Sequence, residues 1–486
     1  MNISYKWLLE YLPCTLSPQE IADTLTSIGL ETGGVEEIET IRGGLRGLVI
    51  GHVLTCEEHP NSDHLHITAV DVGADAPLQI VCGAPNVAAG QKVVVATVGT
   101  TLYHGEEEFA IKKSKIRGVE SFGMICSEVE IGVGSSNDGI IVLPSDAPVG
   151  MPAAEYYHVE SDYCIEVDIT PNRVDATSHY GVARDLAASL KRNGVPAELK
   201  LPEVNLPTDI IDSRIEVKVA DATACPRYQG LVIRDITVGE SPEWLRNRLQ
   251  AIGLRPINNI VDITNYVLHE FGQPLHAFDL AFIKEDRVHV QTVAEGTPFV
   301  TLDGVERKLT AEDLMICDSN GDPMCVAGVF GGLHSGVTEK TKDVFLESAN
   351  FNSTMVRRTA RRLGLNTDSS FRFERGLDPE RTDWALRRAA SLILEITGGR
   401  LGGMTDVYPN PLKPHQICLS FEKVNSVIGR TIEPETVRSI LDSLEIRISK
   451  EEDGVMTLEV PRYRTDVTRD VDVIEEIMRI YGYNQV

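Results

Sequence analysis

The sequence predicts a multidomain α+β protein, and three observations support this fold class. The chain has 486 residues, too many for one hydrophobic core, which indicates roughly three or four domains of about 150 residues each. Short β-rich segments follow one another between residues 39 and 150, whereas helical and strand-like segments alternate after residue 205. The proline-rich stretch "YPNPLKP" then separates off a last, compact segment.

The N-terminal region predicts a small α+β domain made of residues 1–38 and 151–195. Residues 5–29 carry two short helical patterns, and Ser17 followed by Pro18 is a typical start for the second helix. A further helix is predicted over residues 179–192. We expect it to pack against the first 30 residues, which makes the intervening segment 39–150 an insertion. That segment contains runs such as "GLVIGHVLTCEEH" and "KVVVATVG" and predicts a small β-barrel.

Two further domains are expected after the linker "NGVPAELKLPEVNLP". Residues 205–405 mix strands such as "YQGLVIRDITV" with helices such as "RTDWALRRAASLILEITGG", which predicts a larger α+β domain. Residues 408–484 predict a small α+β domain. The sequence stops directly after a helical pattern, so we expect the natural polypeptide to be longer.

The composition is that of an ordinary soluble globular protein, with 42% hydrophobic and 24% charged residues. No stretch approaches the roughly 18 apolar residues of a membrane span, so no membrane association is expected. The N-terminus lacks a secretory pattern, and a cytoplasmic location follows. Nine scattered cysteines without C-x-x-C argue against a zinc cluster and against a disulfide framework.

The formal charge of −26 excludes binding of nucleic acid over the whole surface. One segment has a local excess of positive charge: residues 357–388 hold nine arginines and five acidic residues. A solvated or ion-paired helical face is the favoured interpretation, and a local nucleic-acid contact is the alternative.

The stretch "NNIVDITNYVLHEFGQPLHAFD", residues 258–279, threads polar side chains through an apolar run. Asn258, Asn259 and Asp262 are suited to capping or turns, whereas Thr264, Asn265, His269, Gln273 and His276 must be hydrogen-bonded if they are buried. An apolar surface with a few placed polar groups is typical of a small-molecule pocket. A satisfied structural network remains the alternative.

The last helix carries a group of carboxylates. Val467, Val471, Ile474, Met478 and Tyr481 recur at three- and four-residue steps and predict its buried stripe. Asp472, Glu475 and Glu476 then share a more exposed face, and Asp466 lies just before the helix. Such oxygens suit Mg²⁺, but acidic residues also stabilise the positive end of a helix dipole, so both interpretations stay open.

Other motifs are weaker. His59, Asp63, His64 and His66 lie close together in sequence, which suggests either a metal site or, more simply, a loop and hairpin. Lys112, Lys113, Lys115 and Arg117 form a basic cluster suited to phosphates, although several lysines on one strand are also commonplace. The phosphate-binding loop G-x-x-x-x-G-K-[ST] and the nucleophile elbow G-x-S-x-G are absent from the sequence.

Over essentially its whole length, the chain resembles the β subunit of bacterial phenylalanyl-tRNA synthetase. The matching segments include "HPNSDHLHITAVDVG", "KIRGVESFGMICSE", the stretch 258–279, "TARRLGLNTDSSFRFERGLDP" and "RYRTDVTRDVDVIEEIMRIYGY". The resemblance implies an oligonucleotide-binding (OB-type) barrel that contacts tRNA, and an editing domain. The basic cluster Lys112, Lys113, Lys115 and Arg117 is our candidate for the tRNA contact. The resemblance further implies a catalytic α subunit that charges tRNA-Phe with ATP in an α2β2 assembly.

The resemblance also implies functional residues. Magnesium ligands fall on Asp466, Asp472, Glu475 and Glu476, in a site shared with the α subunit. Catalytic residues of the editing pocket fall on Thr264, Asn265, His276 and Glu347, and its substrate-binding residues fall on Pro274, Gly328, Gly331 and Ala349.

Physical chemistry explains why a second, editing site is useful. An apolar pocket for phenylalanine rejects tyrosine by only about 100-fold, because the ligand merely gains a hydroxyl. A site whose buried carboxyl group pairs with that hydroxyl discriminates far better. We therefore expect Glu347 to bind the tyrosine hydroxyl of mischarged Tyr-tRNA-Phe, with water attacking the ester directly. The alternatives are a non-catalytic tRNA-binding or assembly module and a metallohydrolase that uses the histidines of residues 59–66.

Overall fold

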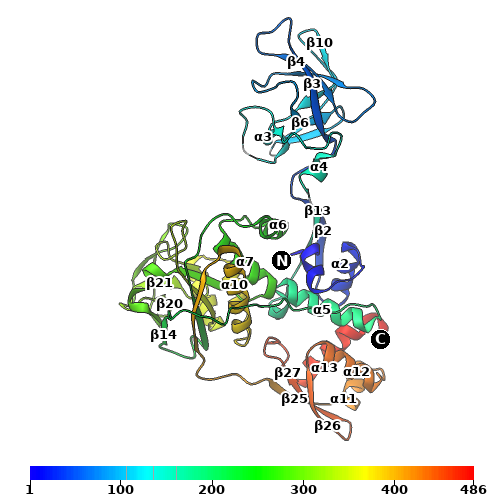
Figure 1. Cartoon of the computed structure of the whole chain (residues 1–486). Helices are drawn as coiled ribbons and strands as arrows, with labels where there is room; N and C mark the ends of the chain where they lie inside the picture. Colours follow the sequence, from blue (N-terminus) through cyan, green and yellow to red (C-terminus); the bar gives the residue numbers. More distant parts are fainter. Residues whose placement is uncertain (105–106, 135, 160) are drawn as a thin grey trace. The chain divides into compact units, whose positions relative to one another are not determined.

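The computed structural model describes residues 1–104, 107–134, 136–159 and 161–486 (Figure 1). The chain forms two compact units: Met1–Glu36 together with Tyr163–Val486, and Glu37–Asp162. The second unit thus interrupts the first in the sequence. Within the described ranges, no helix is both long enough and apolar enough to span a membrane. The fold is mixed α+β with several sheets.

The unit Glu37–Asp162 is built on a strongly curved antiparallel sheet. Its strands follow the order β11-β6-β3-β4-β5, and β12 also pairs with β6. The amide of Phe122 donates to the carbonyl of Gln79 at 2.9 Å, which brings the two ends of the sheet together into a nearly closed barrel. The strands are β3 (Leu48–Glu58), β4 (His66–Asp71), β5 (Leu78–Cys82), β6 (Lys92–Thr97), β11 (Gly123–Ile125) and β12 (Val142–Leu143).

Strand β6 explains the uninterrupted apolar run in this segment. Val93 and Val95 belong to one buried cluster, whereas Val94 and Ala96 belong to another on the opposite face. A strand covered on both faces needs no polar alternation. Shorter elements complete the unit: β7 (Thr101–His104), β8 (Glu107–Ala110), β9 (Ser114–Ile116), β10 (Val119–Ser121), α3 (Glu128–Ile131) and α4 (Ala153–Tyr156).

The first part of the larger unit contains the predicted N-terminal helices. Ser17 caps α2 (Pro18–Ser27) with a capping box and Pro18 is its first residue, as predicted. Helix α5 (His179–Arg192) has the predicted bounds. The ring of Trp7 is stacked between those of His179 and Tyr266, with centroids 3.8 and 4.5 Å away. The remaining elements are β1 (Asn2–Ser4), α1 (Tyr5–Tyr11), β2 (Thr32–Glu39) and β13 (Ser161–Val167), in a sheet of order β1-β13-β2.

Two sheets form the segment that holds the editing candidates. The four-stranded sheet has the order β16-β23-β15-β24, and α7 and α10 lie side by side against it (Figure 1). The second sheet has the order β14-β17-β20-β21-β22. The elements of the first layer are β15 (Arg227–Arg234), α6 (Glu243–Ala251), α7 (Asn259–Phe271), β16 (Leu275–Asp279), β23 (Val344–Asn350), α10 (Arg381–Thr397) and β24 (Arg400–Val407).

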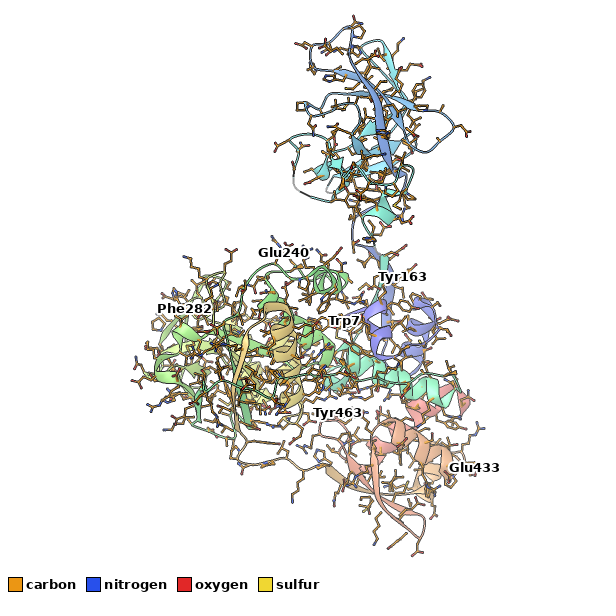
Figure 2. All side chains as sticks on the ribbon, viewed as in Figure 1. Trp7, Tyr163, Glu240, Phe282, Glu433 and Tyr463 are labelled. Atoms are coloured by element: carbon orange, nitrogen blue, oxygen red, sulfur yellow. The ribbon has the colours of Figure 1, made fainter. Side chains whose placement is uncertain are left out.

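The second sheet and the connecting helices cover the other face of the four-stranded sheet. The strands are β14 (Glu216–Val219), β17 (Arg287–Thr292), β18 (Pro298–Val300), β19 (Glu306–Lys308), β20 (Leu314–Cys317), β21 (Pro323–Val326) and β22 (Phe330–Gly331). The helices are α8 (Ser353–Leu363) and α9 (Asp368–Phe373). In Figure 2, Phe282 lies at the edge of this region, which agrees with its 47% exposure.

The C-terminal segment packs helices on a three-stranded sheet of order β25-β27-β26. The predicted stripe of the last helix is wrong at Val471, which is 40% exposed. Val467 and Ile474 of that stripe are buried as predicted, Met478 and Tyr481 are half-buried, and the buried apolar face is completed by Val473, Ile477 and Ile480. The elements are β25 (His415–Ser420), α11 (Phe421–Ile428), α12 (Pro434–Ser443), β26 (Arg447–Glu452), β27 (Val455–Val460) and α13 (Asp470–Tyr481).

Gly230 on β15 provides a test of this packing. A Cβ atom at Gly230 would lie 2.0 Å from Cζ of Phe345, a ring that is fully buried. Gly230→Ala should therefore lower the free energy of unfolding by about 1–3 kcal/mol, because the core cannot accept the extra carbon without shifting. Urea denaturation measures the effect. Gly239→Ala is the control, since nothing lies within 4 Å of its Cβ position. Equal stabilities of the two variants would contradict the packing described.

Candidate active site

His276 and Glu347 face each other across two hydrogen-bonded strands. They are direct partners in the antiparallel pair of β16 and β23, so their side chains point to the same face of the sheet. Directly opposed residues have Cβ atoms roughly 4.5–5.5 Å apart. Tyr228 and Ala349, a second direct pair, share this face. The sheet register therefore brings together two residues that are 71 positions apart in sequence.

Glu347 lies in an apolar environment with a single hydrogen-bond partner. It is 5% exposed, and the hydroxyl of Tyr228 donates to its Oε2 at 2.6 Å. No other described residue hydrogen-bonds to its carboxyl group. Burial raises the pKa of Glu347 to about 8, and the bond from Tyr228 only partly opposes this shift. Glu347 is consequently protonated at neutral pH and is able to donate as well as accept a hydrogen bond.

His276 is also held in its neutral form. Burial lowers the pKa of its imidazole to about 4. Its ring packs edge-on against Phe278 with centroids 4.5 Å apart, and its Nε2 is buried without a hydrogen-bond partner among the described residues. Buried polar atoms are rarely left unpaired in folded proteins. This nitrogen is therefore available to a bound water or ligand.

Gly331 provides the space beside the histidine ring. A Cβ atom at Gly331 would lie 2.9 Å from Cε1 of His276. Gly328 lies farther along the same segment, with φ of +69°, and a Cβ atom there would meet Phe351 and Phe373 at 2.9–3.0 Å. Both glycines are thus needed for close packing, which is one reason for glycine in such segments.

The polar residues of the stretch 258–279 divide into two groups. Asn258 caps α7 by accepting from the amides of Ile260 and Val261, and the side chain of Gln273 donates to the carbonyls of Pro274 and Ala349. The structural alternative explains these residues. Among the described residues of this stretch, Nε2 of His276 and Oε1 of Gln273 are the buried side-chain atoms without a hydrogen-bond partner, and the His276 nitrogen fits the pocket interpretation.

Thr264 and Asn265 lie on α7, which packs on the opposite face of the sheet from His276. Helix α7 and the side chains of Ala277 and Leu346 belong to one apolar cluster, whereas Phe278 and Phe345 belong to another. The hydroxyl of Thr264 donates to the carbonyl of Val261 at 2.7 Å, and Asn265 is half-buried. Among the residues described, no hydrogen bond joins either of them to His276 or Glu347.

The four acidic residues near the C-terminus line one cavity of about 310 Å³, together with Arg173 and Arg479. Arginines hold three of them. Arg464 pairs with Asp466 at 3.1 Å and with Glu476, and Arg469 pairs with Asp472 at 2.7 Å. Glu475 is exposed and makes no ion pair with a described residue.

This arrangement does not by itself fit a magnesium ion. The carboxylates of Asp466, Asp472 and Glu476 already have cationic partners, and Arg479 adds a second one to Glu476 at 2.6 Å. These arginines hold the pKa of Glu476 well below its usual range, despite its burial. Within the described residues, no group of three or more histidine, cysteine or acidic side chains is arranged to hold a metal.

The basic residues of the barrel are exposed. Lys112, Lys113, Lys115 and Arg117 lie on and beside β9. Lys113 pairs with Glu120 at 2.9 Å, and Arg117 donates to the carbonyl of Asn61 at 3.0 Å. The ring of His59 is occupied by backbone groups, since its Nδ1 accepts from the amide of Asn61. This bond gives His59 a structural role, and nothing described favours the metallohydrolase.

Tyr228 is a site residue that the sequence did not indicate. Its contact with Glu347 depends on the pairing of β15 with β23, which no local pattern encodes. The only local signal is Gly230, two residues later, whose missing side chain leaves space for Phe345.

Comparison with known proteins identifies first the class and then similar proteins. The chain matches the models of a putative tRNA binding domain at residues 48–152, of the B3/4 domain at 224–398 and of the tRNA synthetase B5 domain at 417–483, and so contains tRNA-synthetase modules. It is 97% identical over all its 486 residues to the phenylalanine–tRNA ligase beta subunit of Porphyromonas gingivalis (strain ATCC BAA-308 / W83). The corresponding subunits of Bacteroides fragilis (strain YCH46) and Salinibacter ruber (strain DSM 13855 / M31) are 62% and 44% identical over the whole chain.

Over its whole length the chain is similar to phenylalanine–tRNA ligase beta subunits, and it spans 59% of the length of each of these relatives.

The charge state of Glu347 predicts a pH dependence of stability. Its pKa is raised from the ordinary 4.5 to about 8 by folding, so the folded chain keeps a proton that the unfolded chain releases. The contribution of the protonated carboxyl group to the free energy of unfolding is complete below the pKa of the unfolded chain. It is lost as the pH rises towards the pKa of the folded chain. Glu347→Gln should therefore gain stability relative to the parent chain, by roughly 3 kcal/mol between pH 5 and pH 7.5.

Urea denaturation at both pH values measures this gain. Glu306→Gln, at an exposed position on β19, is the matched control and should show no such trend. If the stability of Glu347→Gln relative to the parent chain changed with pH no more than that of the control, the carboxyl group of Glu347 would be ionised in the folded chain.

Proposed function

We propose that this chain is part of a phenylalanine–tRNA ligase β subunit that hydrolyses mischarged Tyr-tRNA-Phe. The pairing of His276 with Glu347 on one face of the sheet is the observation that carries the proposal. In the same proposal, residues 39–150 form an OB-type tRNA-binding domain, residues 205–405 the editing domain and residues 408–484 a small α+β domain. Residues 1–38 and 151–195 form the N-terminal domain.

Glu347 is the proposed specificity residue. Because the carboxyl group is neutral and Tyr228 holds only its Oε2, the remaining oxygen is free to bond the phenolic hydroxyl of a bound tyrosine. Phenylalanine would leave this oxygen buried and unpaired, which costs about 1–3 kcal/mol. The pocket then holds tyrosine and rejects the correct amino acid.

His276 is the proposed positioning group for the hydrolytic water. Its neutral ring and unpartnered Nε2 provide one acceptor or donor at the base of the pocket. A water held there would attack the ester carbon and expel the ribose oxygen, so no nucleophilic side chain is required. Thr264, Asn265 and Pro274 are proposed to orient the ester, and Gly328, Gly331 and Ala349 to shape the walls. For these roles, the aminoacyl ester must contact Thr264 and Asn265 on α7 as well as His276 on β16.

Binding of tRNA and assembly are further parts of the proposal. Lys112, Lys113, Lys115 and Arg117 are proposed to contact tRNA-Phe phosphates, because they are exposed in a segment that matches a tRNA-binding domain. A separate α subunit is proposed to charge tRNA-Phe with ATP in an α2β2 assembly located in the cytoplasm.

Replacement of Glu347 tests the editing proposal. In the full-length subunit assembled with its α partner, Glu347→Ala should lower kcat/KM for deacylation of Tyr-tRNA-Phe by roughly 100-fold, because the site loses its contact with the hydroxyl. Charging of tRNA-Phe with phenylalanine should be unchanged, and Glu306→Ala serves as the surface control. Deacylation at the normal rate would remove Glu347 from the mechanism.

Deacylation by the chain alone distinguishes the editing proposal from a non-catalytic tRNA-binding or assembly module. The editing proposal expects turnover that is lost in His276→Ala. A module without catalytic function expects tRNA binding and no turnover.

Magnesium is proposed to bind at Asp466, Asp472, Glu475 and Glu476 only in the assembled enzyme, where the α subunit contributes to the site. Mg²⁺ at about 5 mM should therefore leave the unfolding temperature of this chain alone unchanged, since a ligand stabilises only a folded state that binds it. Differential scanning calorimetry with and without the ion measures this. If Mg²⁺ raised the unfolding temperature by several degrees, and Glu475→Gln abolished this rise, the chain alone would be sufficient to bind the ion.

A further inference from the structure

Helices α8 and α9 carry a concentration of positive charge that is unusual in this chain. Between residues 353 and 375 there are six arginines and two acidic residues, although the whole chain has a net charge of −26. Ion pairs account for half of the arginines: Arg362 pairs with Asp313, Arg372 with Asp368 and Arg375 with Glu374. Arg357, Arg358 and Arg361 are exposed and pair with no acidic residue in the described ranges.

We define the α8–α9 arginine cluster as Arg357 and Arg361 of α8 together with Arg375, which follows the end of α9. Arg357 and Arg361 are four residues apart on α8 and share one of its faces. Arg358 lies on the neighbouring face, in a cavity that also contains Glu312 and Asp313, and is left out of the cluster for that reason. Burial and the positive charge of Arg357 lower the pKa of Arg375, against the opposing effect of Glu374.

Arg375 pairs with Glu374 through Nη1 at 3.2 Å, but its Nε is a donor that no described group uses. Its guanidinium lies 3.6 Å from the ring centroid of Phe371, which fixes its plane. Its Nε is buried and has no hydrogen-bond partner in the described part of the chain. A buried donor of this kind, close enough to Arg357 for the two positive charges to repel each other, is available to a further negatively charged acceptor.

The same helices are attached to the wall of the candidate active site. Helix α8 begins three residues after β23, which carries Glu347 and Ala349. A Cβ at Gly328 would meet Phe351, Val356 and Phe373 within 3.2 Å. The hydroxyl of Ser369 donates to the carbonyl of Gly328 at 3.1 Å, and that of Thr367 to the carbonyl of Val329 at 2.8 Å. The cluster is therefore fixed to the segment that leads to Gly331 and His276.

We propose that the α8–α9 arginine cluster binds backbone phosphates in the single-stranded 3′ end of the mischarged tRNA while its ester lies between His276 and Glu347. This inference rests on the editing function proposed above. Guanidinium groups bind phosphates with two parallel hydrogen bonds, and their charge neutralises the polyanion locally on an otherwise acidic protein. The barrel and the cluster then hold different parts of the same RNA.

The double variant Arg357→Gln/Arg361→Gln tests the proposal in the full-length subunit assembled with its α partner. We expect KM for deacylation of Tyr-tRNA-Phe to rise about tenfold with kcat within about twofold of the parent, because phosphate contacts position the substrate and take no part in the chemistry. The slope of log affinity for tRNA against log salt should become shallower by about 1.4, which is about 0.7 for each lost contact to a single strand.

The variant Arg255→Gln/Arg400→Gln is the matched control, because it removes two exposed arginines and changes the net charge equally. Fluorescence anisotropy with uncharged tRNA reports binding without any deacylation. Affinity and salt slope equal to those of the control would overturn the cluster proposal alone. A different outcome separates the two proposals. If Arg357→Gln/Arg361→Gln binds tRNA more weakly than the control, but the parent enzyme does not deacylate Tyr-tRNA-Phe, the cluster proposal is supported and the editing function is refuted.

Discussion

The antiparallel pairing of β16 with β23 is the constraint on which the candidate site depends. It sets His276 opposite Glu347, and the next strand in the sheet brings Tyr228 to the same face. Because side chains alternate along a strand, a slip of one residue would turn Glu347 towards α7 and α10. The apolar clusters on the two faces oppose such a slip, since Phe278 and Phe345 would exchange places with Ala277 and Leu346. Core packing and site geometry therefore depend on the same register.

Burial has opposite consequences in the two groups of carboxyl side chains. Glu347 has no cationic neighbour among the residues that the structure describes, so low polarity keeps it protonated. Glu476 is equally enclosed, but Arg464 and Arg479 keep it ionised, and Arg479 also pairs with Asp185 of α5 at 2.9 Å. The first arrangement produces a neutral hydrogen-bonding group suited to recognising another neutral group. The ion pairs around Glu476 join the last helix to α5. They also neutralise negative charge that would otherwise attract a metal cation.

The sequence predicted local features well and long-range ones poorly. The bounds of α5 and the Ser17 cap depend on neighbouring residues, so periodicity and capping preferences were sufficient. The buried stripe of α13 was wrong at Val471, because the partners of that helix, which bury Glu476 and Arg479, come from distant segments. The roles of His276 and Glu347 were inferred from the resemblance and stay predictions, whereas the contact of Tyr228 with Glu347 depends on strand order. No spacing rule would have shown that α7 covers the face opposite His276.

The connection between the two units has a consequence for how this architecture varies. The chain leaves the larger unit along β2 and returns along β13, and these strands are neighbours in one sheet. A segment whose two ends are held together in this way can be exchanged as a cassette, with a short turn closing the gap, while the host core keeps its chain order. Recombination at these two strands therefore replaces the inserted segment without rebuilding the sheet that carries His276 and Glu347.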